Sequence, residues 1–450
     1  MKSHGFRDTG RTDRRPALPG VHTPTSLAHL MRCLDSNANI AAPLRPRGAG
    51  SSATDCNVAT MGTVISTIGL DRIIRIDTYN HAVTVEAGVR LGTLIAALAD
   101  EDLELIGNFD QTERTIGGAI ASPCMGPGIG SQASMLSTQV LSMKAVTAAG
   151  KIMKITNTQK HLLSAFRLSY GMLGVIFEVT LRVRQMATFS ASHRSLDIDT
   201  FAQVSDRLAT GNIGLKFYLM PHRNHVYLDL RHYETATGNA YSAPWKIKDW
   251  GESTVLPNVF KSLSRVLPIP SVRYRLIDSI SATTHDLVNS RLVRSGNNAT
   301  AGGRHRRRTP RNLLYSTWCF PASDFSLVVK AYAQFCRDNF ERTAYRCDLP
   351  ALGVRVAKDN TALLSPSFDE PVIALQTVST QQRGWDDFVL DLSEFAENWG
   401  GTPVFNQTLA ARDDCVSQIY SERLEFFKKI RRQLDPGGRF LNPYLARYFK

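Results

Sequence analysis

The chain has 450 residues, of which 43% are hydrophobic and 21% charged, so it can build two or three domains with large cores and is not a disordered chain. Its net charge of +13 would suit a nucleic acid, a membrane surface or an anionic small molecule. No zinc-finger, helix-turn-helix or RNA-binding motif accompanies the charge, so no nucleic-acid partner is expected. No apolar run of about 18 residues is present, which predicts no transmembrane segment. Seven scattered cysteines without a CxxC pair, and an N-terminus without an apolar stretch, predict reduced thiols, no metal site and a cytoplasmic protein.

The first part of the chain mixes short helical and strand-like patterns. Residues 1–18 are basic and lack an apolar stretch, which predicts a mobile tail. Residues 19–186 predict an α+β unit whose strands form neighbouring hairpins. Its expected helices lie at 24–36, within 90–105 and at 160–168. Its expected strands lie at 39–47, 73–77 and 82–88, in a hairpin over 140–155 that turns at Ala149-Gly150, and at the end of 169–183.

Residues 187–415 predict a second domain built on a sheet. A long hairpin is expected over 214–234, with further strands within 313–325 and 372–380. The stretch 235–312 is long, rich in Gly, Asn, Ser and Arg, and predicted to be an irregular basic insert. Within it, "GGRHRRRTPR" at 302–311 is either a solvated loop or a flap that attracts an anion. A helix over 417–434 ends at "DPGG".

Two glycine-rich segments, at 48–50 and 117–118, each follow a strand-like pattern and predict tight turns. Such turns expose backbone N–H groups that can bind an anion such as a pyrophosphate without a lysine. Neither segment is the GxGxxG fingerprint of a βαβ unit, and no P-loop GK[ST] is present. Each segment taken alone is better explained as an ordinary tight turn.

The ordered set of motifs is more specific than any one of them. "RGAGSS" (47–52), "VTVEAG", "TIGGAIAS" (115–122), "TAAG", "GMLGVIFEVTL" and "LDPGGRFLNPYL" occur in this order along the chain. The set resembles the vanillyl-alcohol-oxidase superfamily, the PCMH-type FAD-binding flavoproteins, and within it the aldonolactone-oxidase and sugar-oxidase branch. The resemblance implies an α+β fold: a two-subdomain FAD-binding domain, and a cap domain with an antiparallel sheet flanked by helices. It also implies that residues 416–450 return to the FAD-binding domain.

FAD is the cofactor that the resemblance implies, with the RGAGSS segment holding its pyrophosphate through backbone N–H groups. The residues implied to bind FAD are Arg47, Gly48, Ala49, Gly50, Ser51, Ser52, Gly88, Thr115, Gly117, Gly118, Ala121, Ser122, Cys124, Met125, Val175, Ile176 and Asn442. Cys124 either contacts the flavin or is a buried inert thiol.

Three positions depart from the family pattern. Covalent members carry a flavin-linked histidine where this chain has Ser51, so a non-covalent flavin is expected. Aldonolactone oxidases carry Glu-x-Arg in a cap strand, where this chain has Gly353-x-Arg355. The family lysine near the flavin is replaced by Gln407. The resemblance thus implies Arg355 and Gln407 as the catalytic residues, whereas His222, His225, Tyr315 and Asp369 remain open as the group that takes the substrate proton.

The resemblance implies an FAD-dependent oxidoreductase, oxidase or dehydrogenase, that takes a hydride from a CH–OH or CH–NH carbon of a small molecule. The missing glutamate and lysine favour a substrate of specialised metabolism. One alternative is a phosphorylated or lipid-linked sugar, with the arginines of 302–311 attracting the anion. Another is a flavin-binding protein without redox turnover. The sequence identifies neither the substrate nor the electron acceptor.

Overall fold

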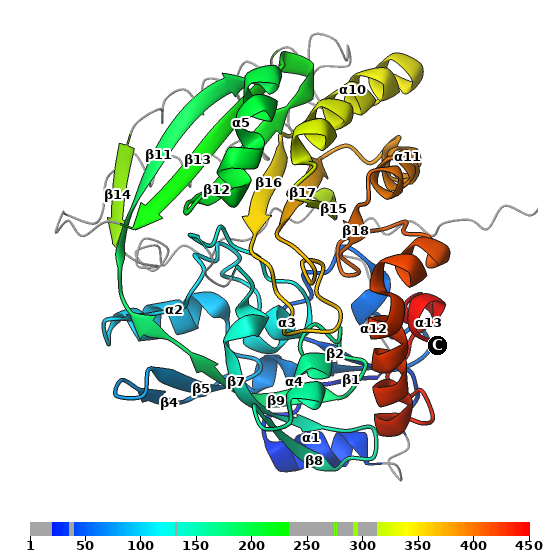
Figure 1. The fold of residues 1–450 in the computed structure, drawn as a ribbon. Helices are drawn as coiled ribbons and strands as arrows, with labels where there is room; N and C mark the ends of the chain where they lie inside the picture. The colour runs from blue at the N-terminus through cyan, green and yellow to red at the C-terminus, as the bar shows by residue number, and fades with distance from the viewer. Residues whose placement is uncertain are drawn as a thin grey trace, which may run out of the picture.

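The structure is a computed structural model that describes residues 20–35, 40–130, 134–233, 274, 276, 291–295 and 313–450. Two layered parts lie one above the other (Figure 1). The lower part in that view is built mainly from the N-terminal half of the chain and contains two main sheets and short helices. The upper part, the cap, carries one large sheet with helices packed on it. This is the expected α+β class, with an antiparallel cap sheet flanked by helices.

The N-terminal part contains a parallel three-stranded sheet in the order β1-β3-β2 and an antiparallel five-stranded sheet in the order β4-β5-β9-β7-β8. The strands are β1 (Val21–His22), β2 (Leu44–Arg47), β3 (Thr63–Ser66), β4 (Ile73–Asp77), β5 (Ala82–Glu86), β7 (Val140–Val146), β8 (Ile152–Thr156) and β9 (Val175–Arg182). A small pair joins β6 (Leu103–Glu104) to β10 (Arg184–Gln185). The helices are α1 (Leu27–Leu34), α2 (Leu91–Ala99), α3 (Ile116–Ala121) and α4 (Lys160–Phe166). Short 3₁₀ turns are η1 (Asp55–Asn57), η2 (Thr67–Gly69) and η3 (Leu136–Gln139).

The cap sheet has eight strands in the order β14-β11-β13-β12-β16-β17-β15-β18. They are β11 (Thr188–Asp197), β12 (Gly214–Met220), β13 (His225–Tyr233), β14 (Arg291–Ser295), β15 (Leu314–Pro321), β16 (Ala351–Val356), β17 (Val372–Ser379) and β18 (Thr402–Pro403). The helices that accompany this sheet in the described residues include α5 (Ile198–Thr210), α10 (Phe325–Thr343) and α11 (Trp385–Asn398). The turn η4 (Pro221–Arg223) joins β12 to β13. Phe217 on β12 packs against Phe201 of α5 and Phe325 of α10, with ring centroids 5.0 and 5.7 Å apart, so one face of the sheet is covered by these helices.

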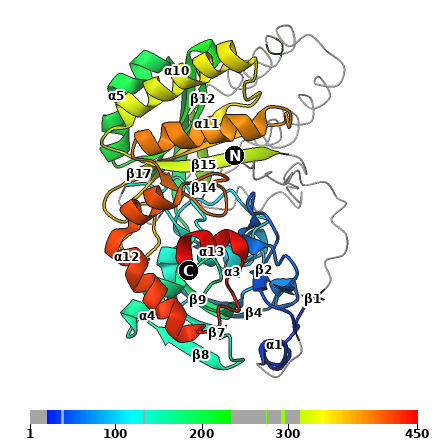
Figure 2. The ribbon, with the colours of Figure 1, turned by 90° about the vertical axis from the view of Figure 1, so that its right-hand side faces the viewer.

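The chain ends on the N-terminal part again. Helix α12 (Asp413–Leu434) descends from the cap along that part, and α13 (Pro443–Phe449) lies beside it (Figure 2). Between these helices, the backbone N–H of Leu44 donates to Arg439 O at 2.6 Å, which adds the C-terminal segment to the edge of β2. This path of the chain is the one expected from domain boundaries at 186 and 415. The exact positions of the two boundaries stay predictions.

Most predicted elements lie where the sequence placed them, and three differ. The TIGGAIAS segment forms helix α3, not a turn, because the Thr115 hydroxyl accepts a hydrogen bond from the Gly118 N–H and starts a helical turn. Helix α12 begins four residues before the predicted start at 417, and it is kinked at Ser421, whose φ is 44°. Strand β14 lies inside the stretch predicted to be irregular, and it pairs with β11. The predicted tail 1–18 and the arginine-rich residues 302–311 lie outside the described residues.

None of the helices in the described part of the chain is both long and apolar enough to cross a membrane.

Candidate FAD-binding site

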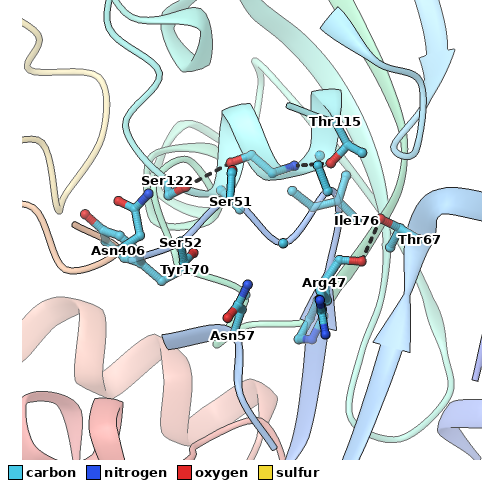
Figure 3. A pocket seen from close by; sticks show the side chains of 18 of the residues that line it. Arg47, Ser51, Ser52, Asn57, Thr67, Thr115, Ser122, Tyr170, Ile176 and Asn406 are labelled. Atoms are coloured by element: carbon cyan, nitrogen blue, oxygen red, sulfur yellow. Dashed lines mark hydrogen bonds between the residues drawn. The ribbon is translucent and has the colours of Figure 1, made fainter. Parts of the chain in front are cut away.

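The predicted RGAGSS and TIGGAIAS segments face each other across one pocket (Figure 3). The pocket encloses about 730 Å³ of space, part of it open to solvent. The predicted residues that line it are Arg47, Gly48, Ala49, Gly50, Ser51, Ser52, Thr115, Gly117, Gly118, Ala121, Ser122 and Ile176. Segments far apart in the sequence thus meet at the pocket that the motifs predicted.

The RGAGSS segment is a loop that continues strand β2, and both of its glycines are required, one by close packing and one by its backbone conformation. A Cβ on Gly48 would lie 1.9 Å from the Thr115 hydroxyl oxygen, so only glycine lets the loop approach α3. Gly50 has a φ of +70°, a conformation that side chains disfavour. Within the described residues, the backbone N–H groups of residues 49–52 have no hydrogen-bond acceptor. The loop therefore presents consecutive free N–H groups to the pocket, the arrangement that binds anions.

The opposite wall is the first turn of α3. A Cβ on Gly117 would lie 2.8 Å from the Ala87 Cβ, so this glycine packs against the chain beyond β5. A Cβ on Gly118 would meet only the Thr115 hydroxyl, at 3.1 Å, so a side chain there would extend into the pocket. The Ser122 hydroxyl donates to Gly118 O at 2.9 Å and completes the turn. This wall leaves room for a ligand close to the backbone.

These features fit the FAD that the resemblance implies. The free N–H groups of residues 49–52 suit a pyrophosphate, and the bare face at Gly118 lets such a group lie against the backbone. Ser51 has no ring nitrogen that could bond to a flavin, so the loop itself provides no covalent attachment.

The other residues predicted to bind FAD lie outside the pocket lining. Gly88 packs against Thr67 O, which a Cβ would approach to 2.0 Å. Val175 belongs to a buried apolar cluster with Phe440, while Met125 forms an isolated bridge with Met135. Asn442 caps α13, and its Nδ2 donates to Asp55 O and Val58 O, both at 2.8 Å, so it braces the chain behind the RGAGSS loop.

Cys124 is fully buried, and burial raises the pKa of its thiol. The structure favours the inert interpretation of this cysteine over contact with a flavin.

Sequence reasoning missed several residues of the pocket. Arg45, Arg114, Tyr170 and Asn406 all line it. The hydroxyl of Tyr170 and the Oδ1 of Asn406 are buried without a hydrogen-bond partner among the described residues. The only sequence signal was adjacency, since Arg45 and Arg114 flank the two motifs and Asn406 precedes Gln407. The same signal applied to Tyr170, which directly precedes the GMLGVIFEVTL motif.

The cap domain also places polar side chains beside the RGAGSS loop. The Tyr315 hydroxyl on β15 donates to Ser51 O at 2.5 Å. The Gln407 Oε1 accepts hydrogen bonds from the Thr317 hydroxyl at 2.7 Å and from Gln376 Nε2 at 3.1 Å. Thr317 and Gln376 are directly paired on β15 and β17, so they share a sheet face. We call Thr317, Gln376 and Gln407 the cap triad.

The loop that carries Gln407 is fixed to the RGAGSS side. The Ala53 N–H donates to Asn406 O at 2.9 Å, and the Thr54 hydroxyl donates to Phe405 O at 2.6 Å. Gln407 therefore lies next to the predicted cofactor loop.

Arg355 lies on the other face of the cap sheet. Gly353 pairs directly with Phe217, which faces helices α5 and α10, and Arg355 is two residues further on the same face. The Arg355 guanidinium donates to Ala209 O at the end of α5 and, at 2.7 Å, to Gly130 O. The structure does not bring Arg355 into the pocket, and its side chain holds a sheet, a helix and a loop together.

Of the four candidates for the proton acceptor, only Tyr315 contacts the cofactor loop. His222 lies in η4, and its ring packs 5.5 Å from that of Phe340 on α10. Burial, with Arg346 and Arg337 nearby, lowers the pKa of His222 to about 4. His225 starts the next strand after that turn, and Asp369 pairs with Arg423 of α12 at 3.4 Å.

The comparisons with known proteins agree with the site. Residues 19–156 match a family described as FAD binding domain, and residues 179–448 match a family described as D-arabinono-1,4-lactone oxidase. The cholesterol oxidase of B. sterolicum superposes with a TM-score of 0.75 over 96% of this chain and 94% of that one. Its identity is 12%, so this likeness establishes the fold alone.

Two of the relatives that align with this sequence illustrate the range of similarity. An L-gulono-1,4-lactone dehydrogenase of Mycobacterium tuberculosis is 33% identical over 209 residues, which cover 46% of this chain and only 47% of that protein. The L-gulonolactone oxidase of Mus musculus is 24% identical over 438 residues, covering 95% of this chain and 94% of that one. The predicted superfamily, its aldonolactone-oxidase branch and the FAD cofactor are confirmed. The chain belongs to the D-arabinono-1,4-lactone oxidase family of FAD-dependent oxidoreductases.

Proposed function

We propose that this chain binds FAD without a covalent link and takes a hydride from a CH–OH or CH–NH carbon of a small molecule of specialised metabolism. The observation that carries the proposal is the row of free N–H groups at residues 49–52, which faces the bare backbone of Gly118 across the pocket. When bound, FAD supplies the hydride acceptor. The relatives named as acting on L-gulonolactone or L-gulono-1,4-lactone make a CH–OH carbon the first choice.

The cap side of the proposed site is neutral where the family pattern is charged. The position of the family glutamate is Gly353, which lies against Phe217 on the helix face, and that of the family lysine is Gln407. In their place the cap triad offers hydroxyl and amide groups. Such groups orient a hydroxylated substrate by hydrogen bonds, but they do not stabilise developing charge as a cation does. This difference supports a substrate other than a simple aldonolactone.

Tyr315 is the residue best placed to handle the substrate proton. Its hydroxyl is held on Ser51 O, so one end of the side chain is fixed beside the cofactor loop. The phenol oxygen can accept a proton from a substrate hydroxyl while its own proton passes to solvent water, because the side chain is partly exposed and the Ser51 carbonyl group cannot hold a proton. We propose Tyr315 for this role in preference to His222, His225 and Asp369, and we keep Gln407 as the catalytic residue of the cap.

The described residues give less support to the two alternative functions. A phosphorylated or lipid-linked sugar was suggested by residues 302–311, which lie outside the described residues. A flavin-binding protein without turnover is compatible with the glycine at position 353, and among the described residues no Asp or Glu side chain lines the pocket.

One experiment tests the proposal and separates the alternatives. The purified protein is reconstituted with FAD and exposed without oxygen to lactones, sugar phosphates and hydroxylated secondary metabolites, while the flavin absorbance is followed. Bleaching by a hydroxylated compound supports the proposal, and bleaching by sugar phosphates alone supports the first alternative. A yellow protein that no compound bleaches points to binding without turnover, whereas a protein that takes up no FAD contradicts the cofactor assignment. Tyr315→Phe should still bind FAD yet bleach more slowly.

A further inference from the structure

Arg45 and Arg114 line the proposed FAD pocket from opposite walls, and neither pairs with a carboxylate of the described residues. We infer that these two buried charges, the arginine pair, are the counter-charge for the diphosphate of the bound cofactor and make the pocket selective for an anionic ligand. The inference rests on the proposed function and adds to it the residues that recognise charge. The free N–H groups of the RGAGSS loop remain the groups in direct contact.

Arg45 is a strand residue whose guanidinium is fully enclosed. It is 1% exposed, and its Nε donates to Cys56 O at 2.9 Å. Its other nitrogens donate to the carbonyl groups of Gly171, Phe440 and Tyr170. Every acceptor is a neutral carbonyl. Burial lowers the pKa of Arg45 to about 10, so the side chain still carries its charge at neutral pH.

Arg114 is arranged in the same way on the α3 wall. It is 6% exposed, and its Nη1 donates to Gln111 Oε1 at 2.9 Å and to Pro123 O at 2.7 Å. Its Nη2 donates to Gly118 O at 2.9 Å, and to the carbonyl and hydroxyl oxygens of Ser122 at 3.1 and 2.8 Å. These acceptors too are all neutral.

The pocket lining as a whole is cationic. Among the described residues it holds Arg45, Arg47 and Arg114 but no Asp or Glu side chain. Proteins rarely bury charges without a partner, because the lost hydration costs several kcal/mol per ion. Carbonyl groups satisfy the N–H donors of the arginine pair but leave its net charge in place. A ligand with negative charge in the pocket would supply the missing compensation.

The arginine pair would act on the ligand through its electrostatic field and not through direct hydrogen bonds to it. The hydrogen bonds that its side chains make go to carbonyl and hydroxyl oxygens of the pocket walls and to Phe440 O of the C-terminal segment. A unit charge about 8 Å from an anion, at an effective dielectric constant of about 20, changes binding by more than about tenfold. This effect vanishes for an uncharged ligand, and that difference makes the inference testable.

The test compares ADP, inorganic pyrophosphate and adenosine as ligands of the full-length protein freed of flavin, measured by titration calorimetry at two salt concentrations. The variant that decides is Arg114→Met, which keeps the length of the side chain and removes its charge. We expect its affinity for ADP and pyrophosphate to fall at least about tenfold, its affinity for adenosine to change less than about twofold, and the salt dependence of ADP binding to weaken. Arg114→Lys should retain most of the preference for ADP.

Two controls separate charge from structure. Arg90→Met removes the same charge from an exposed residue outside the pocket lining, and it should leave ADP affinity within about twofold of the unchanged protein. Thermal unfolding and circular dichroism report whether each variant is folded, which matters most for Arg45→Met because it also loses hydrogen bonds to four carbonyl groups. Equal losses for ADP and adenosine in folded Arg114→Met would overturn the inference and leave the arginine a structural role. If the unaltered protein binds neither ADP, pyrophosphate nor FAD, the proposed function fails as well.

Discussion

The ring of Phe217 lies against the backbone of Gly353, so closely that a Cβ at position 353 would be 1.9 Å from the Phe217 Cζ. The two residues are direct neighbours on β12 and β16, on the face that packs against α5 and α10. The aromatic ring thus occupies the space that any side chain at 353 would need. This contact explains why the acidic position of the family pattern is a glycine in this chain.

Any side chain at 353 should therefore destabilise the cap. Gly353→Ala is expected to lower the free energy of unfolding by about 1–3 kcal/mol, the usual cost of overpacking, measured by chemical denaturation. Phe217→Ala should cost about 3–5 kcal/mol by itself. The double variant should be more stable than the sum of the two losses implies, because the new methyl group enters the space of the ring. Strict additivity would mean that the two residues do not share this space.

The flavin should be held without a covalent bond, because Ser51 stands where covalent members have histidine. Acid precipitation of the yellow protein should leave the colour in the supernatant, and the released compound should run as FAD in chromatography. Colour that stays in the pellet would contradict the prediction. Cys124 is a poor candidate for such a link, since burial raises the pKa of its thiol.

Gly118→Val should abolish FAD binding without unfolding the protein. A Cβ at 118 meets only the Thr115 hydroxyl, so the larger side chain would extend into the pocket and exclude the ligand. Gly117→Val provides the contrast, because its side chain would strike Ala87 and should lower the melting temperature. A Gly118→Val protein that purifies with full flavin content would show that this wall does not touch the cofactor.

Gln407→Lys should raise the reduction potential of the bound flavin. A lysine at this position adds a cation near the site, and charge-assisted hydrogen bonds exceed neutral ones by about 1–2 kcal/mol. This corresponds to roughly 20–40 mV for a two-electron couple. Redox titration is the measurement, with Gln407→Met as the neutral control that also removes the acceptor of Thr317 and Gln376. Equal potentials in both variants would mean that residue 407 does not face the flavin.

Arg355→Ala should lower the stability of the protein more than its catalytic activity. The variant leaves Ala209 O and Gly130 O without their donor, and each buried unpaired group costs about 1–3 kcal/mol. We expect a lower melting temperature, with KM and the flavin spectrum changed little in the protein that remains folded. A large rise in KM at unchanged stability would restore the substrate-binding role that the family pattern implied for Arg355.

The sequence determined those parts of the site that depend on the backbone. Gly48, Gly50 and Gly118 stand where a side chain would collide, would force an unfavourable φ or would enter the pocket, so their identities could be interpreted one by one. The hairpins of the N-terminal part followed from alternating apolar residues and turn signals. Helix α3 escaped this reasoning because adjacent glycines disfavour a helix, while the cap from Thr115 and packing against Ala87 stabilise one here.

Only the tertiary structure decided which residues share the pocket with those loops. The period of two along β16 places Gly353 and Arg355 on one face, but the pattern cannot say which face turns to the cofactor domain. The packing of Phe217 on α5 and α10 settled that question. The Tyr315 contact with Ser51 O and the enclosure of Arg45 join segments more than a hundred residues apart. The first contact depends on how the cap packs on the N-terminal part, and the second on how distant segments of that part pack on one another, and local sequence patterns carry no information on either.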